Sequence, residues 1–446
     1  MAKRSVAVFC LLATISVPAH ADTDPDGFVL SGNARLRYET IEGQARAGFN
    51  ARDQWTSLRS QLHVEWRHQA LQLVGELWDS RVWGANATSP LSTSDVNTFE
   101  PVQAYLRANL GSALGQGTAT TVQAGRMMLN LGSRRLVAAD DYRNTSNSYT
   151  GLRAEVTTRS GLDFNGFYVL PQTRLPDASS ALLDNGTALD KESFSAVLWG
   201  GLLARQPRGS AWLVEASFIH FGERDAPGHP TRDRSLHNAG LRFSADPRPG
   251  HVDGGAEAIY QWGHTSTSLA ATAPAAPVSA TFLRAHLGYT LAARWHPHIL
   301  AEFDRASGDG RSGTYGRFDT LFGMRRSDLG PAALYSALVR SNLLTPGLRV
   351  EITPSPRFDA FVGYRALWLA DAHDAFSGTG VRDATGRSGT FAGHQIDARA
   401  RRWLIAGHLR AEADVTYLAR GHFLETAPNA PKSDTRYASV AISAFF

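Results

Sequence analysis

Short segments of alternating apolar and polar residues recur along almost the whole chain, and they constrain its fold more than any other feature. In the first such segment, residues 28–40, Phe28 and Leu36 fall on one set of alternate positions, while Arg35 and Arg37 fall on the other. Because successive side chains of a β-strand point to opposite faces of the sheet, this spacing gives each strand one apolar and one polar face. The pattern therefore predicts an all-β fold.

About eighteen segments carry this alternation, and turn-forming residues separate them. We predict strands near residues 28–40, 54–67, 70–81, 99–110, 118–129, 148–158, 161–170, 192–204, 209–222, 235–246, 251–263, 279–292, 296–306, 341–353, 357–370, 390–400, 402–419 and 434–446.

The connections between these segments alternate between short and long. The short turns include residues 67–69, 159–161, 206–208, 246–250 and 353–356, and the longest loop is 307–340. A soluble sandwich would also alternate in polarity, but it gives no reason for this regularity. We therefore expect a single transmembrane antiparallel β-barrel of about eighteen strands in outer-membrane lipid, with short periplasmic turns and long extracellular loops.

Both ends of the chain support export to a bacterial outer membrane. Lys3 and Arg4 precede an apolar run over residues 6–17, and Ala19-His20-Ala21 supplies the small residues of a cleavage site. This pattern predicts a signal peptide at residues 1–21 and a barrel domain over residues 22–446. The only cysteine, Cys10, lies within that signal, so the mature chain would have no thiol chemistry.

The last segment ends in an aromatic residue on its apolar face. Ala438, Val440, Ile442, Ala444 and Phe446 share that face. Outer-membrane barrels commonly finish in such a strand, so we expect the barrel assembly machinery to recognise Phe446 as a partner.

The basic residues are almost all arginine. Lysine occurs only at Lys3, Lys191 and Lys432, which leaves arginine at 42 of the 45 basic positions. Genomic base composition is one explanation; the other is that planar guanidinium groups bind carboxylates through two parallel hydrogen bonds. The net charge of +4 is spread along the chain, which argues against a nucleic-acid partner.

The alternation places most charged residues on the face that would line the lumen. An arginine facing lipid near the midplane would cost about 2–4 kcal/mol, so the lumen is where these residues belong. Rings of basic groups select anions, and interleaved carboxylates keep binding weak; alternatively the charges brace the barrel as salt-bridge ladders. The candidate lumen and selectivity residues are Arg35, Arg37, Arg59, Arg107, Arg126, Arg153, Arg242, Arg284, Arg349, Arg365, Glu155, Glu302 and Asp304.

Three motifs, in order, resemble those of the alginate export family of outer-membrane barrels. The first runs from Gly125 to Val137 and continues through 141–145 to 149–154; the others are 306–310 with 317–322, and 341–350. The resemblance spans most of the mature chain, although Met127 and Tyr142 depart from the family pattern. It implies an eighteen-stranded pore that passes the polyuronate alginate through an electropositive constriction.

We therefore expect a passive, monomeric pore for an anionic solute or polysaccharide, with polyuronate export as the first reading. An uptake porin for small carboxylates or other nutrients is the main alternative, followed by an outer-membrane hydrolase and a structural, adhesin-like barrel. Neither Gly-x-Ser-x-Gly nor His-Glu-x-x-His occurs, so we predict no enzyme, metal site or cofactor. We also expect the 307–340 loop, or another, to fold inward or cap the mouth.

Overall fold

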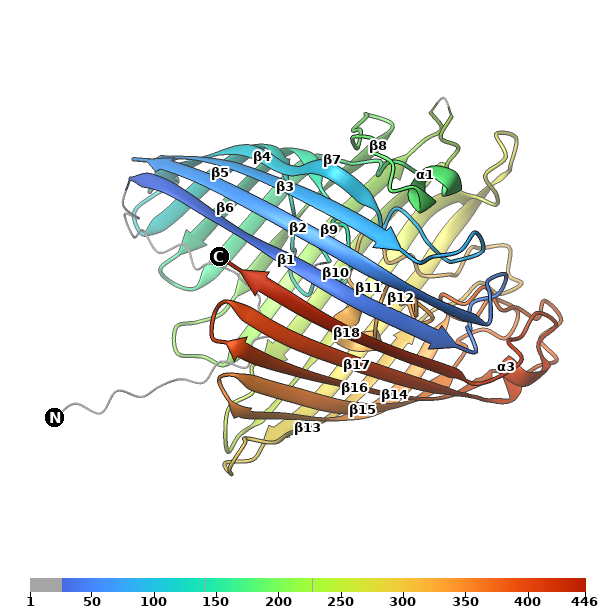
Figure 1. The fold of residues 1–446 in the computed structure, drawn as a ribbon. Coiled ribbons are helices and arrows are strands. Elements are labelled where there is room, and N and C mark those ends of the chain that lie inside the picture. The colour runs from blue at the N-terminus through green and yellow to red at the C-terminus, as the bar shows by residue number, and fades with distance from the viewer. Residues whose placement is uncertain (1–25, 141, 227) are drawn as a thin grey trace.

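The computed structural model describes residues 26–140, 142–226 and 228–446, and its strands form one closed eighteen-stranded barrel (Figure 1). The expected signal peptide, residues 1–21, lies outside the described residues. The strands are β1 (Gly27–Glu42), β2 (Arg52–His68), β3 (Leu71–Trp83), β4 (Asn97–Gly111), β5 (Thr118–Met127), β6 (Tyr149–Thr158), β7 (Leu162–Pro171), β8 (Ala196–Arg205), β9 (Trp212–Glu223), β10 (Ser235–Ala245), β11 (Val252–Ser266), β12 (Ala275–Thr290), β13 (His298–Ala306), β14 (Leu343–Ser355), β15 (Phe358–Trp368), β16 (Phe391–Ile405), β17 (Leu409–Arg420) and β18 (Thr435–Phe445).

Each strand pairs antiparallel with its neighbours in the sequence, and the first and last strands close the ring. β1 pairs with β18 in a register that sets Arg37 opposite Ala441. β1 also pairs with β2, with Arg35 opposite Arg59. Closure leaves no strand edge with unpaired backbone groups, which a barrel in lipid requires.

The predicted two faces are present on the strands. Leu36 is 52% exposed on the outer surface, whereas its neighbours Arg35 and Arg37 are only 8% and 2% exposed. The outer face is therefore the apolar one, and the polar side chains line the lumen. This is the reverse of a soluble sandwich, whose apolar face would be buried.

Short and long connections lie at opposite ends of the barrel, as predicted (Figure 1). We call these the short-turn end and the long-loop end; β1 begins, and β18 ends, at the short-turn end. The three short helices all lie in long connections: α1 (Ser179–Leu183), α2 (Arg326–Leu329) and α3 (His422–Thr426). Among the described residues, no helix is long and apolar enough to cross a membrane.

One predicted turn was misplaced. The turn expected near residue 401 lies instead at residues 406–408, so β16 continues to Ile405. The adjacent Arg401 and Arg402 interrupt the alternation of polarity, but Arg399 and Arg401 alternate inward and both bind Asp359 at 3.0 Å. Gly407, with a φ of +75°, provides the turn itself.

Candidate functional site

Two of the long connections fold into the barrel and occupy its lumen. They are residues 128–148, between β5 and β6, and residues 307–342, between β13 and β14. The two lie side by side, because Val137 and Phe322 form a parallel bridge and the Ala138 amide donates to the Phe322 carbonyl at 3.1 Å. The inward fold expected for 307–340 is thus confirmed, and the 128–148 loop joins it there.

Arginines of the wall hold the 128–148 loop through its backbone. Arg35 and Arg59 both donate to the Arg143 carbonyl, at 2.9 and 3.0 Å. Arg37 donates to the Tyr142 carbonyl at 2.8 Å and forms an ion pair with Glu39. These three predicted lumen residues therefore fix a loop in position.

Asn144 of the same loop also binds the barrel wall and the adjoining loop. The buried Asn144 amide donates to the carbonyls of Leu58, Arg81 and Asp95, at 3.0, 3.2 and 2.9 Å. Four of the five residues of the 141–145 motif are described, and Asn144 and Thr145 among them are buried structural contacts. A packing role thus accounts for this part of the family motif.

Four predicted residues meet in one buried ionic cluster on β12, β13 and β15. Arg284 binds Glu302 and Asp304, both at 2.7 Å. Arg365 binds Glu302 and lies 3.2 Å from Asp304. Arg365 reaches β13 across β14 because Gly347 lies between them, where a β-carbon would sit 3.0 Å from the Arg365 side chain.

Asp328 of α2 ties this cluster to both inserted loops. Its carboxylate accepts from Arg135 of the 128–148 loop at 2.8 Å and from Arg340 of its own loop, and it lies 3.7 Å from Arg284. Burial disfavours the charged carboxylate, but the three arginines outweigh that effect and hold the pKa of Asp328 well below its usual value. We call Asp328, Arg135, Arg284 and Arg340 the loop clamp.

The other predicted residues form separate pairs around the wall. Arg107 and Arg153 share Glu155, at 3.4 and 2.6 Å. Arg126 binds Glu100, Arg242 binds Glu215 at 3.3 Å, and Arg349 binds Glu351 at 2.8 Å. Every predicted arginine thus has an acceptor within the protein, and the set does not form one ring.

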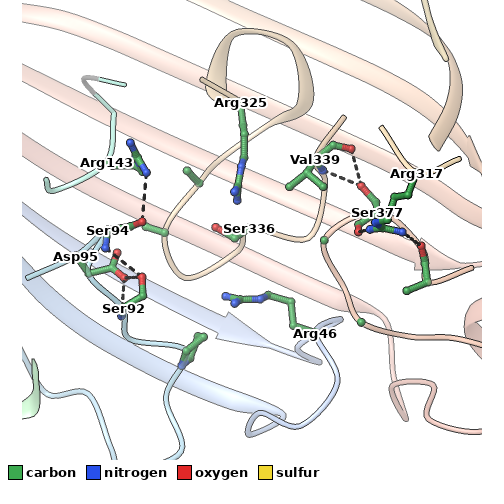
Figure 2. A pocket seen from close by; sticks show the side chains of 16 residues that line it. Arg46, Ser92, Ser94, Asp95, Arg143, Arg317, Arg325, Ser336, Val339 and Ser377 are labelled. Atoms are coloured by element: carbon green, nitrogen blue, oxygen red, sulfur yellow. Dashed lines mark hydrogen bonds between the residues drawn. The ribbon is translucent and has the colours of Figure 1, made fainter. Parts of the chain in front are cut away.

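A cavity of about 480 Å³ lies among the long loops. Its lining includes four arginines, Arg46, Arg143, Arg317 and Arg325, and one acid, Asp95. We call this cavity the vestibule. Figure 2 shows Arg46 and Arg325 directed into it from opposite sides, with Ser336 between them.

The four vestibule arginines are not equally neutralised. Arg143 lies 3.2 Å from Asp140, and Arg317 lies 2.7 Å from Asp374. Within the described part of the chain, the guanidinium groups of Arg46 and Arg325 form no ion pair or hydrogen bond, although Arg46 covers the Phe49 ring at 4.7 Å. These two cations are therefore available to an anion that enters the vestibule.

The pKa values of the vestibule groups reflect mainly the burial of these side chains in a partly dehydrated space. Burial, and then repulsion by Arg143, lowers the pKa of Arg325 to about 10, and burial lowers that of Arg46. Burial also raises the pKa of Asp95 to about 6. A bound anion would relieve the repulsion between the cations.

The sequence did not reveal the vestibule because its four arginines come from three different loops. Period-two spacing assigns a face only within a strand, so Arg46 and Arg325 carried no signal, and Arg143 and Arg317 were noted only as parts of family motifs. Among the described residues, no group of three or more His, Cys, Asp or Glu side chains is arranged to hold a metal ion.

Solved structures similar to this chain include outer-membrane porins of Pseudomonas aeruginosa. OccK2 in complex with glucuronate aligns with a TM-score of 0.58 and 12% identity, over 94% of this chain and 96% of that one. OccK9 aligns with a TM-score of 0.61 and 10% identity, over 94% and 98% of the two chains. OpdK with vanillate gives a TM-score of 0.59 and 11% identity, over 94% and 100%. At these identities the likeness concerns the fold.

The sequence comparisons identify the family. No curated protein matches the chain. The model of the alginate export family matches residues 29–438, which covers nearly all the described strands. The long-loop end is accordingly extracellular and the short-turn end periplasmic, and the chain belongs to the alginate export family of bacterial outer-membrane β-barrels.

Proposed function

We propose that this outer-membrane pore passes an anionic solute whose carboxylates bind in the vestibule, and that the solute is a polyuronate on its way out of the cell. The observation that carries the proposal is the pair Arg46 and Arg325, two cations without an acid partner among the described residues on opposite sides of a cavity. A polyuronate presents one carboxylate on each sugar. Guanidinium groups bind carboxylates through paired hydrogen bonds, so the carboxylates of successive sugars would bind first to one arginine and then to the other as the polymer moves.

The wall arginines have a different part in this proposal. Arg35, Arg37 and Arg59 position the loop that forms one side of the vestibule, and the remaining predicted arginines supply a positive lumen potential moderated by their acid partners. Mixed charge of this kind favours anions while keeping each binding step weak enough for release. Replacing Arg153 and Arg365 together with alanine should therefore reduce anion preference.

Uptake of small carboxylates is the second candidate, and the filled lumen favours it. The two inserted loops leave a vestibule of about 480 Å³, within the range of roughly 300–1,000 Å³ that holds small ligands. Two of the similar porin structures contain a small carboxylate, glucuronate in OccK2 and vanillate in OpdK. Under this reading the vestibule is an entry site for one uronate-sized acid.

Planar-bilayer recording separates these functions. The purified protein would be exposed to polymannuronate, to glucuronate and to a neutral dextran, and current block and ion selectivity would be measured. Block by the polymer at concentrations where glucuronate has no effect supports export, whereas block by glucuronate alone supports uptake. A barrel that inserts but conducts no ions would rule out both pores and leave the hydrolase and the structural barrel.

Two double variants connect the result to the vestibule. Arg46→Gln with Arg325→Gln should weaken anionic block at least tenfold, since each lost charge-assisted contact is worth about 1.5–3 kcal/mol. Arg224→Gln with Arg387→Gln removes the same charge from exposed extracellular loops outside the vestibule and should leave block unchanged. Equal weakening in both would contradict a site at the vestibule. Monomeric state and recognition of Phe446 by the assembly machinery stay predictions.

A further inference from the structure

A second cavity lies at the periplasmic rim of the barrel. It has a volume of about 360 Å³ and is lined by Ser355, Arg357, Phe358, Arg402, Trp403 and Leu404. These residues belong to the β14–β15 turn and to the last residues of β16, where that strand approaches its short turn (Figure 1). We call this cavity the rim cleft.

The rim cleft lies partly on the outer face of the barrel. Arg401 points inward and binds Asp359, so the next residue, Arg402, points outward. Phe358 is paired with Arg402 across the strands and shares its face, and Leu404, two residues further along, is 49% exposed. Trp403, two residues beyond Arg401, follows the inward alternation and lies under the Arg410 guanidinium, so the cleft sits at the rim, where the outer face meets the periplasmic turns.

Two guanidinium groups border the cleft without a counter-charge. Within the described residues, the side chains of Arg357 and Arg402 form neither an ion pair nor a hydrogen bond. The backbone holds them together, because the Trp403 amide donates to the Arg357 carbonyl at 2.9 Å. An outward arginine is tolerated near a membrane interface, where its cost falls to about 0–1 kcal/mol, and the anions available there are lipid phosphates.

The outer surface next to the cleft is apolar and made of small side chains. Ala360 of β15 pairs with Ala400 of β16, which pairs with Ala413 of β17, and all three follow the outward alternation of Phe358 and Arg402. Val362 and Ala398 form the next outward pair toward the membrane centre. A hydrocarbon chain lying on this surface would contact these small side chains and the apolar Ile352 and Phe358 that flank them.

We propose that the rim cleft binds the phosphate of an anionic phospholipid in the periplasmic leaflet, with Arg357 and Arg402 on the phosphate and an acyl chain over the alanine surface. Phospholipid is the occupant because the cleft combines paired cations with an apolar, lipid-facing surface at the periplasmic end. A soluble phosphate would use the cations but not the alanines. The inference is independent of what passes through the lumen.

Native mass spectrometry of the full barrel in a neutral detergent tests this proposal, with phosphatidylglycerol and phosphatidylcholine added in equal amounts. The wild-type protein should retain phosphatidylglycerol preferentially. Arg357→Gln with Arg402→Gln should reduce that retention roughly tenfold or more, since each arginine near an anionic surface contributes about 1 kcal/mol. The matched control, Arg208→Gln with Arg248→Gln, removes two exposed arginines from other periplasmic turns and should retain the lipid.

Three results would overturn the proposal: unchanged retention in the Arg357/Arg402 variant, equal loss in the Arg208/Arg248 control, or displacement of the lipid by glycerol 3-phosphate at the same concentration. The last would identify a phosphate site without a lipid. Folding of each variant is checked by its heat-modifiable mobility on gels. If the double variant does not fold, Arg357→Gln alone, which lies in the turn outside the strands, should give a several-fold loss of retention, and no loss would count against the cleft.

Discussion

The loop clamp should decide whether the lumen is closed or open, and Asp328 is the residue through which this can be measured. Its carboxylate is buried and receives Arg135, Arg340 and Arg284. The change Asp328→Asn keeps the shape of the side chain but removes its negative charge. The three guanidinium groups are then affected unequally, and their remaining partners set the size of the effect.

Two of the three arginines keep an acid partner in the variant. Arg135 still binds Glu257, and Arg284 still binds Glu302 and Asp304. Arg340, which is only 1% exposed, keeps the Met324 carbonyl and loses its one carboxylate. Breaking a buried ion pair by removing one partner costs about 3–5 kcal/mol, and because a single arginine is orphaned we expect about 3 kcal/mol.

That energy should favour the state in which the 307–342 loop leaves the 128–148 loop. Since about 1.4 kcal/mol corresponds to a tenfold change in an equilibrium, the open population should rise by roughly a hundredfold. Single-channel recordings should then show larger and noisier currents in Asp328→Asn, and hydrogen exchange of amides in 318–340 should accelerate. Glu425→Gln, a change at an exposed residue of α3, serves as the control.

A double variant checks the mechanism. Adding Arg340→Gln removes the orphaned charge, so the double variant should be less perturbed than the sum of the two single changes. Wild-type currents and exchange rates in Asp328→Asn would refute the reasoning, because they would mean that apolar packing alone holds the loops. Strict additivity in the double variant would show that Arg340 is not the group left uncompensated.

Three further predictions concern the vestibule and the wall. Asp95, with a pKa of about 6, is charged above that pH and neutral below it, so polymannuronate should block the pore more tightly at about pH 5 than at about pH 7.5. The Asp95→Asn pore should be blocked tightly at both pH values. If the variant kept the wild-type pH dependence, a group other than Asp95 would be responsible for it. Arg365→Ala leaves Glu302 and Asp304 with Arg284 alone and should cost about 3–5 kcal/mol, seen as a lower heat-modification temperature, whereas Arg153→Ala, whose partner Glu155 keeps Arg107, should cost less. Gly393→Ala places a β-carbon 2.0 Å from the Ala419 carbonyl oxygen at a φ of +138° and should impair folding. Gly75→Ala, with open space around the new β-carbon, should fold normally. If the two variants were equally stable, this would argue against backbone strain at Gly393 in β16.

The strands and their faces could be predicted because the information is local. The position of Leu36 or Arg37 in the alternation fixes which face of the sheet its side chain occupies. Because one face meets lipid and the other water, a shift of the strand register by one residue would cost free energy at every position. The same locality explains the misplaced turn near Arg401, where two adjacent arginines interrupt the alternation inside a continuous strand. Eighteen strands with alternating connections then leave a closed barrel as the solution.

The interior of the barrel was decided by the tertiary structure. Loops have no periodicity, so nothing in the sequence relates Arg135 to Asp328, which lie 193 residues apart and meet in the lumen. The sequence likewise predicted that arginines would line the lumen, but not which of them are neutralised. Glu302 and Asp304 of β13 hold both Arg284 of the adjacent β12 and Arg365, which reaches them across β14, whereas Arg46 and Arg325 come from different loops and face a cavity. Charge balance in a confined space depends on which groups three-dimensional folding brings within a few ångströms, and alternation along a strand carries no information about that.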